Sequence, residues 1–221
     1  CEKVCPILNC KPLEEKTPAA YVIRTKNQND LVQSTSGGFS TPLAQWFFSK
    51  GGSVWTASYD NNWNVVHREF TKDDVDELKK GRWVCFIGTT CQVYGLKEFL
   101  KKDYENLITV DLVCHGTPSP KLWEKYIDFQ TRKYNSRITD INFRNKTYGY
   151  HSGTMMIKFE NGKKYTGSAR VDYMLKSFFS EIASRPSCYT CKFKQLNRVS
   201  DYTVFDCWHM GELLGKKDDD R

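Results

Sequence analysis

The chain has 221 residues, of which 39% are hydrophobic and 14% aromatic, enough for one large domain or a domain with an appendage. No apolar run approaches the roughly 20 residues of a membrane-spanning helix. The net charge of +7 suits an acidic partner or a phosphate-bearing cofactor. However, the 33 basic residues are scattered among 26 acidic ones, so a nucleic-acid-binding module is the weakest interpretation.

The predicted elements alternate between helices and strands along the chain. Apolar residues recur at helical spacing in some segments, and β-branched or aromatic runs bounded by turn residues occupy others. In chain order, we predict a helix over 39–49, a strand hairpin over 53–59 and 64–70, a helix over 71–80, a strand over 83–87, a helix over 92–102, a strand over 107–113, a helix over 120–134, strands over 138–143, 155–159 and 163–165, a helix over 172–182 and a strand over 202–205.

This alternation predicts an α/β (α+β) fold, a mixed sheet with flanking helices and a β-hairpin region near residues 138–170. We expect residues 1–20 to be the remnant of an N-terminal ferredoxin-like cluster segment with its linker. Residues 21–221 are then the main domain, which we expect to be truncated at its C-terminus. Because a natural chain begins with Met, we also expect residues upstream of position 1 to be missing.

Four cysteines predict a metal site. Cys91 and Cys114 each follow an apolar strand-like run, and Cys188 and Cys191 form a CxxC pair, all in segments that we predict to be loops. Four thiolates select zinc or an iron–sulfur cluster over hard cations. The alternative is that they are small buried residues, as free cysteines often are.

The N-terminus carries a second thiolate signal. Cys1 and Cys5, followed by Pro6, match the last half of the bacterial ferredoxin pattern, which ends C-x3-C-P. Cys10 falls outside this pattern and is expected to be structural or free. Nine cysteines grouped in such motifs indicate metal binding in a reducing cytoplasm rather than the disulfides of a secreted protein.

Two further segments are candidates for anion binding. Ser36, Gly37 and Gly38 precede a helix and could present backbone N–H groups to a phosphate, although an ordinary N-cap explains them equally well. Arg144 and Lys146 follow a strand end and could bind an anion, but solvated charges on a strand edge are as common.

Three other residues near these motifs are not counted as metal ligands. His115 could donate a hydrogen bond to a cluster sulfur or could cap the backbone of its loop. Cys85 lies inside a strand and is predicted to be core, and Cys207 is predicted to be packed rather than ligating. No Ser–His–Asp or paired-carboxylate constellation is recognisable, so no catalytic residue is assigned.

Several motifs in this order resemble the coenzyme F420 hydrogenase/dehydrogenase beta-subunit family, over nearly the whole chain from Cys1 to about Trp208. The motifs that carry the resemblance are Ser36–Phe39, Gly88–Gln92, Asp111–Gly116 with Pro118–Pro120, Asn142–Arg144 with Lys146, Arg185–Cys188 with Cys191, and Ser200–Asp201 with Asp206–Trp208. The chain departs from the family pattern at Thr90 (usually Pro) and at Cys207 (usually Phe). It also lacks the upstream half of the ferredoxin motif and a segment near residues 76–80.

The resemblance implies a flavin- and 4Fe–4S-dependent oxidoreductase. It implies that a 4Fe–4S cluster binds the four cysteines named above, and that Cys1 and Cys5 belong to a second cluster. FAD would bind Ser36, Gly37, Gly38, Arg144 and Lys146. Electrons would pass between a small organic hydride donor or acceptor, such as a deazaflavin coenzyme, and ferredoxin or another electron-transfer protein.

A structural zinc protein that uses the same four cysteines, without redox activity, is the alternative function. The sequence is compatible with a homo-oligomer. It does not identify the substrate.

Overall fold

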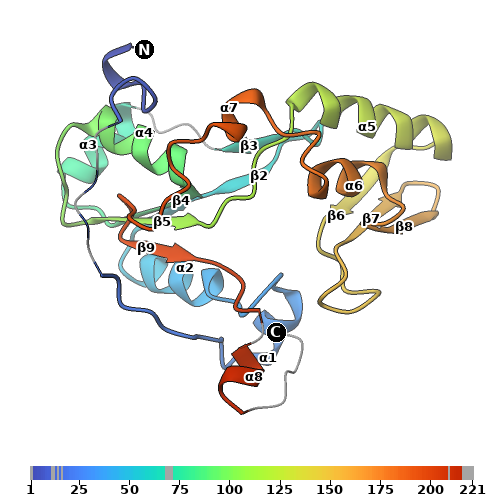
Figure 1. Cartoon of the computed structure of the whole chain (residues 1–221), viewed down its shortest axis with the longest axis horizontal. Helices are drawn as coiled ribbons and strands as arrows, with labels where there is room; N and C mark the ends of the chain where they lie inside the picture. Colours follow the sequence, from blue (N-terminus) through green and yellow to red (C-terminus); the bar gives the residue numbers. More distant parts are fainter. Residues whose placement is uncertain are drawn as a thin grey trace. The chain divides into compact units, whose positions relative to one another are not determined.

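The computed structural model describes residues 2–10, 13, 15, 17–67, 72–208 and 210–215 (Figure 1). These residues form two compact units, which are described separately. Unit 1 comprises the described residues up to Asp60 together with Val65–His115 and Cys191–Cys207, and unit 2 comprises Asn61–Asn64, Gly116–Thr190 and the described residues from Trp208 onward.

Unit 1 is built on a parallel four-stranded sheet. Its strands have the order β1 (Ser53–Trp55), β4 (Val84–Thr89), β5 (Leu107–Leu112) and β9 (Tyr202–Val204). Three helices of the same unit, α2 (Ser40–Ser49), α3 (Lys72–Lys79) and α4 (Thr90–Leu100), connect or flank these strands. The predicted mixed α/β fold with flanking helices is confirmed.

The alternation of side chains along β4 gives the sheet two buried faces. Val84 and Phe86 join a core cluster that includes Leu78 of α3 and Val93 of α4. The intervening Cys85 belongs to a second cluster, with Phe47 of α2 and Val110 of β5. A strand buried on both faces is apolar at consecutive positions, which is why this segment is a continuous hydrophobic run rather than an alternating one.

The predicted strand over 53–59 is wrong as a single element, because it divides between two sheets. Its first part is β1, which pairs in parallel with β4. Its second part is β2 (Ala57–Tyr59), which pairs with β3 (Val65–His67) in an antiparallel hairpin. The hairpin itself is confirmed, and the end of its predicted second strand, residues 68–70, lies outside the described residues.

Helix α4 begins at Thr90, two residues before the predicted start. Gln92 accepts a hydrogen bond from the Thr89 backbone N–H at 2.8 Å, which completes a capping box at the end of β4. Two short helical segments of unit 1 were not predicted: η1 (Glu2–Val4) and α1 (Gln28–Gln33).

Unit 2 contains a three-stranded antiparallel sheet of β6 (Ile138–Asn142), β7 (Thr154–Phe159) and β8 (Lys164–Ser168). This is the predicted hairpin region, and Gly162 has a positive φ of 80° in the tight turn that joins β7 and β8. Its helices are α5 (Pro120–Tyr134), α6 (Tyr173–Phe179), α7 (Pro186–Tyr189) and α8 (Met210–Leu213).

A buried carboxylate, Asp172, joins the helices and the sheet of unit 2. It is fully buried and accepts hydrogen bonds from the phenols of Tyr126 in α5 (2.6 Å) and Tyr165 in β8 (2.9 Å). It also caps α6 by accepting from Leu175 N at 2.8 Å. Burial, reinforced by the nearby carboxylate, raises the pKa of both phenols well above the ordinary value, so both remain donors.

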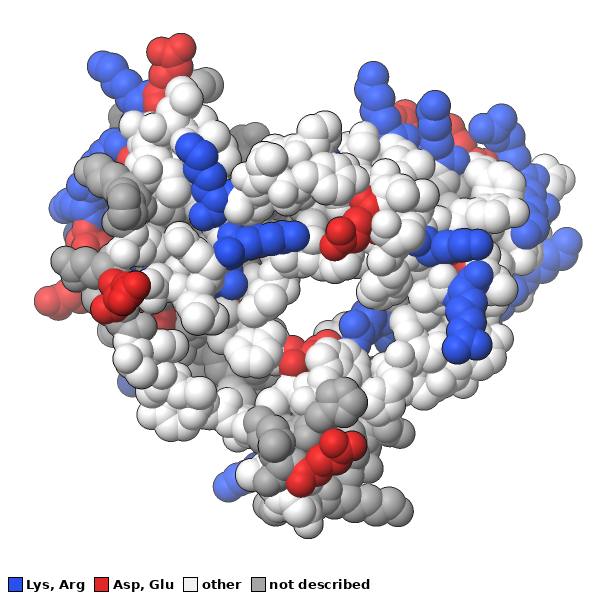
Figure 2. Space-filling view, viewed as in Figure 1, with Lys and Arg blue, Asp and Glu red and all other residues white. Residues whose placement is uncertain are grey.

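The surface carries both signs of charge. On the face shown in Figure 2, Lys and Arg side chains are spread over the surface and lie among acidic ones. Among the helices of the described residues, none is long and apolar enough to cross a membrane.

Replacing Asp172 by Ala should lower the free energy of unfolding by about 3 kcal/mol or more, because it leaves the buried phenol of Tyr126, the partly buried phenol of Tyr165 and a helix N–H without an acceptor. Urea unfolding followed by circular dichroism measures this effect. The matched control is Asp128→Ala on the exposed side of α5, which we expect to change stability by less than about 0.5 kcal/mol. Equal losses in the two variants would contradict the role given to Asp172.

Candidate functional site

Cys91 and Cys114 occupy equivalent positions after neighbouring strands. Strands β4 and β5 are parallel, and their last residues, Thr89 and Leu112, are paired in register. Each cysteine follows two residues after its strand end. In open α/β sheets, ligands bind at the carboxyl ends of the strands, so the sheet brings these two thiols to one edge of unit 1.

The predicted loop position of Cys91 is wrong, because this residue lies in the first turn of α4. The capping box starts the helix early and fixes the backbone that carries the thiol. Its side chain is exposed, and its sulfur lies 3.1 Å from the Thr89 hydroxyl oxygen, within hydrogen-bonding distance. A thiol held at a strand end and beside a hydroxyl group is suitable as a metal ligand.

A buried ion pair fixes the chain around these cysteines. Asp111 of β5 is fully buried, and its carboxylate lies 3.4 Å from a guanidinium nitrogen of Arg198. The same guanidinium group donates to the hydroxyl of Thr90, beside Cys91. Thr203 of β9 donates to the other carboxylate oxygen of Asp111 at 2.6 Å.

A second carboxylate fixes the same chain segment to β5. Asp201 accepts hydrogen bonds from the backbone N–H and the hydroxyl of Thr109, both at 2.7 Å. Together with the Asp111–Arg198 ion pair, this contact joins the segment after Cys191 to the strand that leads to Cys114. Three of the four predicted ligands therefore belong to one rigidly connected part of unit 1.

The N-terminal segment of unit 1 packs against α4. Pro6 approaches Gly95, where an added Cβ would lie 3.8 Å from the proline ring. The phenol of Tyr94 donates to the carbonyl of Asn9 at 3.3 Å. On the other side, Lys192 Nζ donates to the carbonyl of Ile7 at 3.2 Å.

These contacts place the segment that contains Cys5 between α4 and the residues that follow Cys191. The segment that contains Cys5 therefore packs against the two parts of unit 1 that carry Cys91 and Cys191. Cys1, the other predicted ligand of this segment, lies outside the described residues.

Cys188 belongs to unit 2 and lies within α7, so its predicted loop position is also wrong. Arg185 N donates to the carbonyl of Thr117 at 2.9 Å, and Pro118 and Ser184 form an isolated antiparallel bridge. This pairing brings the start of α7 beside the segment that begins at Gly116.

None of the four predicted ligands forms a disulfide, and none is fully buried. Their donor chemistry fits a thiolate-bound cluster. Within the described ranges, no three His, Cys, Asp or Glu side chains lie close enough to form a metal-binding group. The boundary between the units falls between Cys188 and Cys191, and the convergence of the four sulfurs stays a prediction.

The other cysteines differ in environment. Cys85 is fully buried, as predicted, and burial raises the pKa of its thiol to about 12. Cys207 is exposed, so the prediction that it is packed is wrong. Cys10 is free and partly buried. A thiol with the pKa of Cys85 stays protonated at neutral pH and is a poor metal ligand.

The glycine pair at 37–38 has a packing explanation. Thr25 N donates to the carbonyl of Gly37 at 2.8 Å, and a Cβ on Gly37 would lie 2.9 Å from the carbonyl oxygen of Ile23. Gly38 has a φ of +76° and is buried against Thr25. Ser36 donates to Asp206. These contacts account for both glycines without a ligand, and phosphate binding at this turn stays a prediction.

Arg144 and Lys146 lie together beside an aromatic ring of unit 2. The guanidinium carbon of Arg144 is 5.8 Å from the ring centroid of Tyr150, and the ammonium nitrogen of Lys146 is 4.4 Å from it. Tyr150 in turn lies 5.3 Å from the ring of Trp208, which also contacts His151.

We call Arg144, Lys146, Tyr150, His151 and Trp208 the basic–aromatic cluster. Cations beside adjacent aromatic rings, which here are tilted or edge-on to one another, can bind a heteroaromatic anion. The two cations were predicted from the sequence, whereas the three aromatic residues were missed. Trp208 is 58 residues from Tyr150 in the sequence, so only the alternation of basic and aromatic residues over 144–151 could have indicated part of the cluster.

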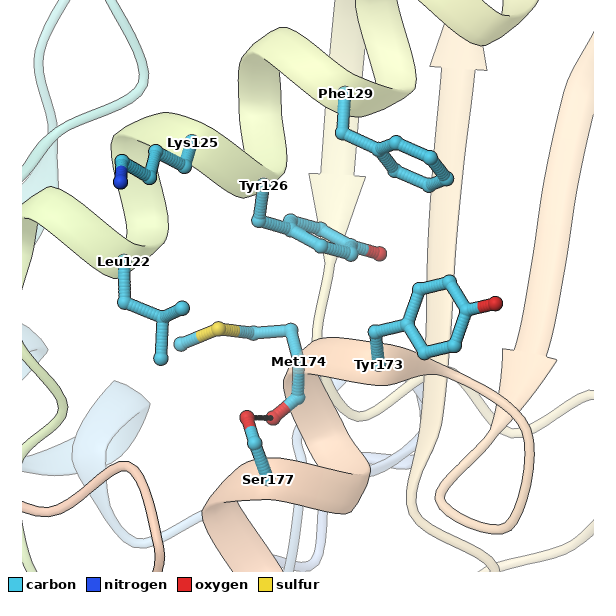
Figure 3. Close-up of a pocket in the computed structure, with 7 residues that line it drawn as sticks. All are labelled: Leu122, Lys125, Tyr126, Phe129, Tyr173, Met174 and Ser177. Carbon is cyan, nitrogen blue, oxygen red and sulfur yellow. Dashed lines mark hydrogen bonds between the residues drawn. The ribbon is translucent and has the colours of Figure 1, made fainter.

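A shallow pocket of about 190 Å³ lies between α5 and α6 (Figure 3). None of the predicted site residues lines it. Tyr126 contributes its ring, while its hydroxyl is engaged by Asp172 in the core. The pocket can accommodate an apolar group, and its lining residues are Leu122, Lys125, Tyr126, Phe129, Tyr173, Met174 and Ser177.

A protein-family model for the C-terminal part of the coenzyme F420 hydrogenase/dehydrogenase beta subunit matches residues 81–220. Comparison with curated proteins gives no significant match. Among solved structures, a chain of the xenon-derivatised F420-reducing [NiFe] hydrogenase complex from Methanosarcina barkeri is 17% identical, with a TM-score of 0.48. The alignment covers 87% of this chain and 74% of that one, and a likeness at this level carries no functional argument.

Replacing Arg198 by Ala should cost about 3–5 kcal/mol of stability, because the Asp111 carboxylate would be left buried without its cation. Urea unfolding measures the loss. The control is Lys79→Ala, which removes the solvent-exposed pair with Asp76 in α3 and should cost less than about 1 kcal/mol. A similarly small effect of both substitutions would show that the buried pair does not stabilise unit 1.

Iodoacetamide at pH 8 should leave Cys85 unmodified in the folded, metal-free chain, because this pH lies far below a thiol pKa of about 12. The exposed thiols of Cys91 and Cys207 should be alkylated first. Peptide mass spectrometry identifies the modified residues, and unfolding in urea should make Cys85 reactive. Alkylation of Cys85 as fast as Cys207 in the folded chain would contradict its placement in the core.

Proposed function

Because the chain belongs to the coenzyme F420 hydrogenase/dehydrogenase beta-subunit family, we propose that it is a flavin- and 4Fe–4S-dependent oxidoreductase. In this function, electrons pass between a soluble organic hydride donor or acceptor and an iron–sulfur cluster or ferredoxin. Membership establishes a hydrogenase or dehydrogenase subunit at a general level. The proposal adds the cofactors, FAD and 4Fe–4S clusters, and the residues that would bind them.

The equivalent positions of Cys91 and Cys114 after two paired parallel strands carry the proposal. The register of β4 and β5 brings both residues to the same edge of the sheet. Neither thiol is fully buried, and neither forms a disulfide. This arrangement supplies two thiolates from rigid strand ends, which is how a fold holds metal ligands in a defined geometry.

The residues around these cysteines have supporting roles in the proposed site. Cys91, Cys114, Cys188 and Cys191 would bind one 4Fe–4S cluster. The Asp111–Arg198 ion pair would keep the three ligands of unit 1 in place, since it connects the strand and helix ends that carry them. The Thr89 hydroxyl donates to Gln92 Oε1 at 3.1 Å and lies at the same distance from the Cys91 sulfur, so it would lower the negative charge on a ligating sulfur by donating to it in place of Gln92.

Cys5, together with Cys1, would bind the second cluster of the proposal. The N-terminal segment that holds Cys5 packs on α4 through Pro6 and Tyr94. Contact of this segment with α4, the helix that carries Cys91, supports electron transfer between the two proposed clusters. A net positive charge of +7 favours an acidic electron-transfer partner such as a ferredoxin.

The basic–aromatic cluster supports binding of a phosphorylated flavin. Arg144 and Lys146 would contact its phosphate groups, and the adjacent aromatic rings offer faces for stacking. The turn at Ser36, Gly37 and Gly38 is a second proposed contact with FAD. When bound, a flavin accepts two electrons as a hydride and releases them one at a time.

A deazaflavin coenzyme is the organic partner that the family's description favours for this chain. We place the protein in the cytoplasm, because thiolate-bound clusters persist in a reducing compartment.

Anaerobic reconstitution with iron, sulfide and FAD tests the proposal. We expect the wild-type chain to bind iron and sulfide in equal amounts, to retain flavin, and to show an absorbance that a reductant bleaches. The Cys114→Ser variant should lose most of the iron of the cluster that Cys91, Cys114, Cys188 and Cys191 would bind. Its circular dichroism spectrum should match that of the wild-type chain, because the fold is retained.

Cys207→Ser is the matched control, because Cys207 is an exposed free thiol that the proposal does not use. Its iron content should equal that of the wild-type protein. Tight binding of zinc, without flavin and without a reducible chromophore, would instead establish the structural zinc alternative.

A further inference from the structure

The hydroxyl of Ser184 is a buried polar group without a partner. Its oxygen makes no hydrogen bond to the described part of the chain. In the described part of the chain, one other buried side-chain atom lacks a hydrogen-bond partner, the amide oxygen of Gln130. The amide nitrogen of Gln130 donates to the Tyr126 hydroxyl in the core. Native proteins rarely keep a buried hydroxyl unpaired, because its loss of hydration is not compensated.

Ser184 lies beside Cys188 in unit 2. A Cβ added to Gly116 would lie 2.7 Å from the Ser184 hydroxyl oxygen and 3.8 Å from the Cβ of Cys188. The serine hydroxyl and the Cβ of Cys188 therefore both lie against Gly116, where a side chain would collide with the hydroxyl. The bridge between Pro118 and Ser184 holds the backbone of these segments together.

We infer that Ser184 is a positioning residue whose hydroxyl donates a hydrogen bond to the Cys188 thiolate when this sulfur binds the cluster. This inference rests on the proposed function. A ligating thiolate supplies the acceptor that the hydroxyl lacks, and a buried hydroxyl has no water to compete for its proton. A donor to a ligating sulfur stabilises the extra negative charge of the reduced cluster and raises its reduction potential.

An equivalent pair exists in unit 1. The Thr89 hydroxyl oxygen lies 3.1 Å from the sulfur of Cys91, another predicted ligand. Two of the four predicted ligands thus have a hydroxyl side chain nearby, one from each unit. The Ser184 hydroxyl differs because it has no other partner, so its removal should act on the Cys188 sulfur alone.

The test compares Ser184→Ala with the wild-type full chain after anaerobic reconstitution with ferrous iron and sulfide. A redox titration followed by electron paramagnetic resonance measures the reduction potential of the cluster. We expect the variant to be harder to reduce by about tenfold in the one-electron equilibrium constant, which corresponds to about 59 mV. Ser187→Ala is the control, because it removes an exposed hydroxyl next to Cys188 in the sequence, and its potential should be unchanged.

The possible results distinguish failure of the proposed oxidoreductase function from failure of the role proposed for Ser184. A wild-type chain that takes up no cluster overturns the proposed function and the role of Ser184 with it. A cluster of normal iron content with an unchanged potential in Ser184→Ala overturns only the role of Ser184. If this variant folds but does not retain the cluster, Ser184→Thr should restore retention, because it keeps the hydroxyl, and failure to do so overturns the inference.

Discussion

The ion pair between Asp111 and Arg198 joins three segments of unit 1 that are distant in the sequence. It connects β5 to the segment after Cys191 and, through Thr90, to the first turn of α4. Because the carboxylate is fully buried, it requires this cation, and the cation in turn fixes the backbone that supplies it. This contact and the capping box at Thr89 together fix the chain segments that carry the thiols of unit 1.

A parallel sheet is a suitable support for such a site. Its strands end at one edge, so residues far apart in the sequence reach the same place without a shared motif. Strand β4 is packed on both faces, so its position is well defined. The capping box at Thr89 joins the end of this strand to the first turn of α4 by hydrogen bonds. Unit 2 uses a different device, the Asp172 carboxylate, to join its helices to an antiparallel sheet.

Hydroxyl groups recur beside the predicted ligands. Thr89 approaches Cys91, and Ser184 and Cys188 both lie against Gly116. In a thiolate-bound cluster, the reduction potential depends on charge, burial and hydrogen bonds to sulfur. In the proposed cluster, hydrogen bonds from these two hydroxyl groups to the ligating sulfurs would therefore raise the reduction potential.

The sequence by itself determined the α/β class, most helices and strands, and the family, because periodicity and motif spacing are local properties, whereas the metal ligands that it indicates stay a prediction. Only the tertiary structure decided that residues 53–59 divide between two sheets and that Cys207 is exposed. It also brought Trp208 to Tyr150 and Arg198 to Asp111. Such contacts depend on which strands pair and which charges are buried together, and the packing of the whole chain sets both.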